Sequence, residues 1–146
     1  ICQEKGVDFY TLDLSAYQEM SREQLMSLLD TIETVKTPVL FHCRHGVDRS
    51  GTASALAAWI LRQQSYGLAK WHSYVPPGPW KYKSWDFNHI SNIFAEYENY
   101  CSENNLETDN IEQFENWARN VYKTDVTVHS VTVKSKRLKV KSSLLR

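Results

Sequence analysis

The sequence predicts an α/β fold with a central, mostly parallel sheet and helices on both faces. Val7 to Leu14, a run rich in β-branched and aromatic residues, follows Gly6 and is typical of a strand. Val39 to Phe41 is apolar without alternation, as expected for a strand buried on both faces of a sheet. Helical spacing of apolar residues follows each run, and this strand–helix order indicates a parallel sheet.

The first expected helix has a capping-box signature. Ser21 is followed three residues later by Gln24, and apolar residues then repeat at helical spacing from Leu25 to Ile32. These features predict an amphipathic helix over about residues 22–35.

The second expected helix follows the Val39 to Phe41 run. From Ser50 onward, small and apolar residues repeat at steps of three and four, which predicts a buried helix to about Gln64. A short loop, Cys43 to Arg49, therefore lies between a predicted strand and a predicted helix.

The second half of the chain predicts further elements. Residues 74–83 hold three of the four prolines and indicate an irregular loop. Helical spacing begins again at Ile90, and once more at Ile111 after an expected cap at Asp109. Residues 125–134 alternate polar residues with valine, which favours an additional strand.

Length and charge limit the classes of partner. The chain has 146 residues, and its 17 basic and 17 acidic residues cancel, so no nucleic-acid partner is expected. No apolar run approaches the roughly 20 residues that a membrane-spanning helix needs, and the cytoplasm is the favoured compartment. The chain begins at Ile1, without an initiator methionine, and we expect it to be truncated at its N-terminus.

Cysteine usage predicts neither a disulfide framework nor a zinc site. Cys2, Cys43 and Cys101 are an odd number without short regular spacing. His42, Cys43 and His45 are close in sequence, but no second Cys or His pair lies at ligand spacing. No metal or organic cofactor is expected.

The segment from Phe41 to Gly51 has the composition of an anion-binding loop. Successive backbone N–H groups and a helix N-terminus can face a bound phosphate there, and Gly46 permits the tight turn. Arg49, six residues after Cys43, can donate two parallel hydrogen bonds to phosphoryl oxygens. The composition therefore predicts a phosphate site beside a thiol.

Cys43 is predicted to be a thiolate nucleophile. A helix N-terminus and an arginine stabilise a thiolate, and pKa values of about 3.5 to 7.5 are typical of such settings. The sulfur can attack phosphorus, giving a cysteinyl-phosphate that water hydrolyses in a second step. Ser50 is expected to donate a hydrogen bond to the leaving sulfur, and His42 to orient the loop through backbone contacts.

The segment HCRHGVDRSG resembles the phosphate-binding loop of the protein tyrosine and dual-specificity phosphatases, whose pattern is H-C-x-x-G-x-x-R-(S/T)-G. Every fixed position is filled, and Asp48 before the arginine is similar to bacterial members of the dual-specificity-like group. The resemblance covers roughly residues 6–100. It implies a phosphatase-type fold and the following substrate-binding residues: His42, Arg44, His45, Gly46, Val47 and Gly51. A phosphatase domain over residues 1–122, lacking its first strands, and a strand with a basic tail over residues 123–146 are expected.

The general acid is the least determined part of the site. The resemblance implies an Asp about 30 residues before the cysteine, which would protonate the leaving group. Asp13 lies at that spacing but inside the strand pattern, Asp48 lies within the loop, and Glu19 lies on the segment between the strand and the helix. Asp13 is ranked first, Asp48 second and Glu19 third.

The expected substrate is a phosphorylated protein or a small phosphomonoester, with phosphotyrosine and phosphoserine/threonine favoured. A phosphoinositide is a weaker alternative, because the loop offers only Arg44, His45 and Arg49 as basic groups. Three other readings stay open: a pseudophosphatase that binds phosphate without turnover, a rhodanese-like sulfur transferase and an arsenate reductase. The Ser50–Gly51 pair favours the phosphatase over the last two.

Overall fold

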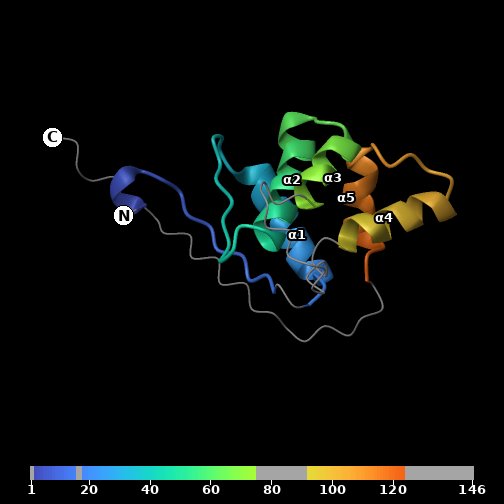
Figure 1. The fold of residues 1–146 in the computed structure, drawn as a ribbon, viewed down its shortest axis with the longest axis horizontal. Coiled ribbons are helices and arrows are strands. Elements are labelled where there is room, and N and C mark those ends of the chain that lie inside the picture. The colour runs from blue at the N-terminus through green and yellow to red at the C-terminus, as the bar shows by residue number, and fades with distance from the viewer. Residues whose placement is uncertain (1, 16–17, 75–91, 124–146) are drawn as a thin grey trace.

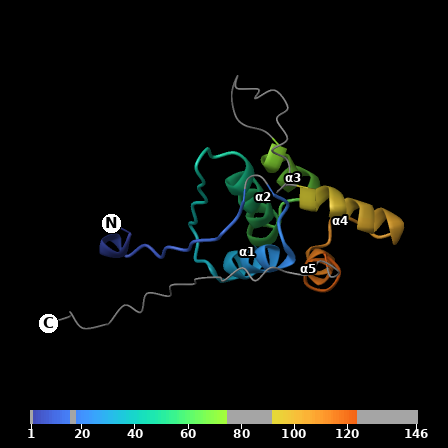
Figure 2. The ribbon, with the colours of Figure 1, turned by 90° about the horizontal axis from the view of Figure 1, so that it is seen from below.

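The computed structural model describes residues 2–15, 18–74 and 92–123, and this part of the chain is helical (Figure 1). A short 3-10 helix, Gln3–Lys5, precedes five α-helices. The α-helices are α1 (Arg22–Thr34), α2 (Asp48–Arg62), α3 (Tyr66–Tyr74), α4 (Asn92–Glu103) and α5 (Ile111–Asn120). They gather into one body, and the segment before Ser15 leads away from it in both views (Figure 2).

The predicted central parallel sheet is wrong for the described residues, because they contain no strand. A strand exists only where its N–H and C=O groups pair with a neighbouring chain, and neither predicted run forms such a ladder. Several apolar side chains of these runs are consequently exposed to solvent, although Leu12, Leu14 and Phe41 pack partly against the core. Phe9 is 62% exposed, and Leu40, expected to be buried on both faces of a sheet, is 85% exposed.

The predicted capping box of the first helix is confirmed. The Ser21 hydroxyl accepts a hydrogen bond from Gln24 N at 3.2 Å, and Gln24 Oε1 accepts one from Ser21 N at 2.9 Å. These bonds satisfy N–H groups that a helix N-terminus otherwise leaves without partners. The helix starts at Arg22 as predicted and ends at Thr34, one residue before the expected end.

The second half differs from expectation in two details. Helix α3 was not predicted, because its apolar residues divide between buried Tyr66 and Ala69 and exposed Leu68 and Trp71. The N-cap of α5 is Asn110, not Asp109, since Asn110 Oδ1 accepts from the backbone N–H of the third helical residue at 3.0 Å.

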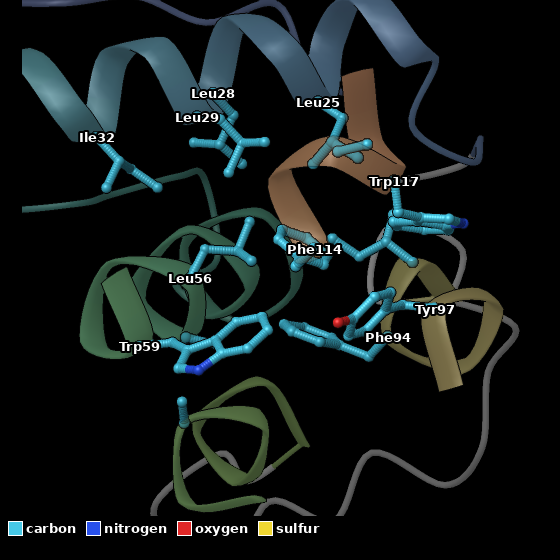
Figure 3. Packing of buried hydrophobic residues seen from close by; sticks show 14 of the residues in the cluster. Leu25, Leu28, Leu29, Ile32, Leu56, Trp59, Phe94, Tyr97, Phe114 and Trp117 are labelled. Carbon is cyan, nitrogen blue, oxygen red and sulfur yellow. The ribbon is translucent and has the colours of Figure 1, made fainter. Parts of the chain in front are cut away.

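The core lies where α1, α2, α4 and α5 meet (Figure 3). Leucines and an isoleucine of α1 face a set of aromatic rings from the other helices. The ring centroids of Trp59 and Phe114 are 5.1 Å apart, and those of Tyr97 and Phe114 are 5.0 Å apart in an edge-to-face arrangement. Such pairs add about 0.5–1.5 kcal/mol each beyond the area they bury.

Asp109 joins α2 to α3 from outside the core. Its Oδ1 accepts hydrogen bonds from Trp59 Nε1 and from Tyr66 N, each at 3.0 Å. Both donors belong to buried residues, which pack against each other with ring centroids 4.9 Å apart. One carboxylate therefore fixes the start of α3 against the body of α2.

Several expectations concern residues outside the described ranges. The predicted strand over residues 125–134 and nearly all of the loop over residues 74–83 lie there, and they stay predictions, as does the division at residue 122. Within the described ranges, no helix is long and apolar enough to cross a membrane.

Asp109→Ala is expected to lower the free energy of unfolding by about 1–3 kcal/mol, because it removes the acceptor for two donors on buried residues. Asp109→Asn is the matched control, since its amide oxygen can still accept. Urea unfolding measures both variants through the midpoint at unchanged slope. Equal midpoints for Asp109→Ala and the wild type would contradict this role.

Candidate active site

The predicted anion-binding loop wraps around the Cys43 sulfur. Residues 44–47 form a bend that enters α2 at one end of the helical body (Figure 2). Gly46 has a φ of +70°, a backbone conformation that side chains with a Cβ rarely adopt. Its N–H donates to Cys43 Sγ across 3.2 Å. The glycine thus allows the turn that points a backbone donor at the thiol.

The first turn of α2 supplies the other side of the sulfur site. Ser50 is only 8% exposed, and its Oγ lies 3.4 Å from Cys43 Sγ. Val47, the N-cap of α2, makes no side-chain capping hydrogen bond. An N-terminus without a side-chain cap leaves its N–H groups available to an anion, and the macrodipole favours negative charge there.

These contacts change the acidity of Cys43. Burial by itself would raise the pKa of the thiol. The Ser50 hydroxyl acts most strongly in the opposite direction, followed by the N–H groups of Ser50, His45 and Gly46. Together they lower the pKa of Cys43 from 9.0 to about 7, which raises the share of thiolate at neutral pH.

Arg49 lies on the same turn, and its guanidinium group makes few hydrogen bonds within the described residues. Its Nη1 donates weakly to the carbonyl oxygen of Leu14, at 3.5 Å, across 35 positions of the sequence. Its buried Nε has no hydrogen-bond partner among the described residues. A buried guanidinium nitrogen that lacks a partner is costly, and an anion bound in the loop could accept a hydrogen bond from it.

The remaining predicted binding residues surround this centre at different exposures. Arg44 and His45 are exposed, as is His42, whereas Val47 is half-buried. Gly51 lies in the first turn of α2, and a Cβ built on it would come within ordinary van der Waals contact of the end of α3, 3.6 Å from the nearest backbone oxygen. Gly51 therefore marks the close approach of α2 and α3 rather than a strained turn.

The three candidate acids have different environments. Burial raises the pKa of Asp48, against the opposing effects of its own N–H, of Arg49 and of His45. Asp13 is exposed, and its backbone adjoins Leu14, the residue that contacts Arg49. Glu19 forms an ion pair with Lys123, with Oε2 and Nζ 2.8 Å apart.

Sequence reasoning missed the contact between Arg49 and the Leu14 carbonyl, and a second bond of Gln24. Besides completing the capping box, Gln24 donates from Nε2 to Asp13 O at 2.6 Å. The capping box was visible in the sequence. A backbone acceptor eleven residues away leaves no sequence signal, because every residue carries a carbonyl.

Within the described ranges, no group of three or more metal-ligating side chains occurs. The thiols of Cys2, Cys43 and Cys101 are all free, and Cys101 is buried in the core.

The loop and the segments before it match a family model. Residues 3–65 match the tyrosine phosphatase family. This match supports a relationship to a protein tyrosine phosphatase-type family. The match supports a phosphatase function, and it ends one residue before α3. No curated protein and no solved structure matches the chain.

The lowered pKa of Cys43 predicts its reactivity. Alkylation by iodoacetamide should rise with pH around an inflection near 7, because the thiolate is the nucleophile. Ser50→Ala should move the inflection upward, since it removes the largest influence that lowers the pKa. Mass spectrometry of the peptide with Cys43 separates this thiol from exposed Cys2. An inflection of the alkylation rate near pH 9 in the wild type would contradict the claim that the contacts to Cys43 Sγ lower its pKa.

Proposed function

We propose that this chain is the catalytic part of a cysteine-dependent phosphomonoester hydrolase that acts on phosphotyrosine, phosphoserine or phosphothreonine in proteins. The observation that carries the proposal is the sulfur of Cys43 at the uncapped start of α2, with the Gly46 N–H and the Ser50 hydroxyl directed at it. A thiol in this setting, within a segment that matches the tyrosine phosphatase family, is suited to attack phosphorus.

Substrate binding in this proposal uses the backbone and Arg49. The N–H groups of the loop and of the first turn of α2 hold the phosphoryl oxygens, as helix N-termini do for anions. Arg49 supports this role because its Nε is without a partner among the described residues and its Nη1 contact to Leu14 O is long. Turning the guanidinium toward a phosphate therefore breaks only one long hydrogen bond among the described residues.

The reaction then proceeds in two displacements. The Cys43 thiolate forms a bond to phosphorus while the bond from phosphorus to the ester oxygen breaks, and a carboxylic acid protonates the departing oxygen. In the second step water forms a bond to phosphorus and gives a proton to the carboxylate that the first step left, while the phosphorus–sulfur bond breaks. Ser50 Oγ, 3.4 Å from the sulfur, can donate a hydrogen bond to the thiolate as it leaves.

The proposed acid is Asp13 or Asp48. A raised pKa keeps a larger share of a carboxyl protonated near neutral pH, and burial gives Asp48 that property. Asp13 is exposed, and its backbone adjoins Leu14, whose carbonyl oxygen contacts Arg49. The pseudophosphatase alternative requires that neither carboxyl acts as a proton donor.

The cytoplasmic compartment also stays a prediction.

Cys43→Ser is expected to abolish hydrolysis of p-nitrophenyl phosphate while inorganic phosphate still binds. The hydroxyl does not ionise at neutral pH, but the backbone donors stay in place. Arg49→Lys should lower kcat/KM by roughly ten- to hundredfold, because a point charge replaces a two-pronged donor. Steady-state kinetics and calorimetry measure both effects. Turnover above a tenth of wild type in Cys43→Ser would remove Cys43 from the mechanism.

A leaving-group comparison identifies the acid. Loss of the acid should slow hydrolysis of an alkyl phosphate by roughly 10²–10⁴-fold, and should slow p-nitrophenyl phosphate much less, because its phenoxide departs without a proton. Asp13→Asn and Asp48→Asn are the matched variants. The residue whose loss shows this dependence, and removes the basic limb of the pH profile, is the acid. If neither variant shows the leaving-group dependence and wild-type turnover is negligible, the pseudophosphatase hypothesis replaces the proposed hydrolase.

A further inference from the structure

Gln24 connects the start of α1 to the segment beside the phosphate loop. Its side-chain amide makes two hydrogen bonds in different directions. Oε1 accepts from Ser21 N at 2.9 Å, and Nε2 donates to Asp13 O at 2.6 Å. Because the first bond holds the amide in place, the second donor is already oriented toward its acceptor.

The segment that Gln24 contacts also reaches Arg49. Leu14 N donates to Leu12 O at 3.2 Å, so the chain turns tightly around Asp13. Leu12 and Leu14 pack against the core, while Asp13 between them is exposed. The carbonyl after this turn, Leu14 O, accepts from Arg49 Nη1. Gln24 therefore holds one carbonyl of the turn, and Arg49 contacts the next carbonyl.

The start of α1 is itself firmly placed. The carbonyl of Met20, immediately before the N-cap, accepts hydrogen bonds from Tyr122 Oη at 2.6 Å and from Lys123 Nζ at 3.2 Å. Met20 and Tyr122 are both buried. Gln24 thus lies on a helix whose start is held in place. Its side chain can therefore define the position of the segment around Asp13, which is not part of a helix or strand.

We propose that Gln24 is a positioning residue for the phosphate site: by holding the turn at Asp13, it sets where the Leu14 carbonyl and the Asp13 carboxyl lie relative to Arg49. The inference rests on the proposed phosphatase function. Placement of this kind acts through preorganisation, so its loss weakens binding and catalysis without removing a reacting group.

Two variants separate positioning from helix capping. Gln24→Glu keeps a carboxylate oxygen to accept from Ser21 N, as glutamate does in capping boxes, but has no donor for Asp13 O. Ser21→Ala removes the capping hydroxyl and leaves the Gln24 amide intact. If Gln24→Glu does not fold, Gln24→Met takes its place; it removes both hydrogen bonds of the side chain, and the effect of Ser21→Ala then gives the part due to the lost cap.

The experiment uses the full chain and measures three quantities: the dissociation constant for inorganic phosphate, kcat/KM for p-nitrophenyl phosphate, and the midpoint of thermal unfolding. Gln24→Glu should raise the phosphate dissociation constant and lower kcat/KM by roughly three- to tenfold, with an unchanged midpoint. Ser21→Ala should lower the midpoint and leave binding and kcat/KM at wild-type values.

The possible failures are distinguishable. If the wild-type chain binds phosphate, and Gln24→Glu has the same phosphate affinity and the same kcat/KM, only the positioning role is overturned. A lower midpoint in Gln24→Glu without a change in phosphate affinity also overturns it, because that pattern describes a cap. A wild-type chain that neither binds phosphate nor hydrolyses the ester overturns the proposed function, and the role of Gln24 with it.

Discussion

The candidate active site depends on the burial of α2. The helix begins at the sulfur site and continues into the aromatic core, where Leu56 and Trp59 are almost completely buried. It packs most extensively against α3 and also against α1. Because α2 is packed along its length, its N-terminus is fixed in position, and so is the loop of residues 44–47 that leads into it. Catalysis through a preorganised set of donors requires this rigidity, because donors that move must be reoriented during the reaction.

The sequence allowed prediction of the features that depend on local chemistry. The Ser21–Gln24 capping box and the periodicity of α1 and α2 are local patterns, and both helices lie within a few residues of their expected bounds. The loop residues could be chosen because Phe41 to Gly51 has the composition of an anion-binding loop and resembles the phosphate-binding loop of the protein tyrosine and dual-specificity phosphatases. Their separate roles in the reaction await the variants described above.

Features that depend on distant partners could not be predicted. The runs that begin at Val7 and Val39 have strand-like composition, but composition does not supply the neighbouring chain that a strand needs. Helix α3 is short and has a mixed apolar pattern, so its formation depends on α2 and on Asp109. The contacts of Tyr122 and Lys123 with Met20 join residues about one hundred positions apart.

The aromatic core also determines how the chain can be divided. The family match ends at residue 65, yet the rings that cover Trp59 come from Tyr66, Tyr97 and Phe114. A fragment cut at the family boundary would keep the Cys43 loop and place the indole of Trp59 in water. The segment that matches the family model and the hydrophobic core around Trp59 therefore have different borders. Gene fusions or domain exchanges in this protein would have to follow the border of the core, which includes α5.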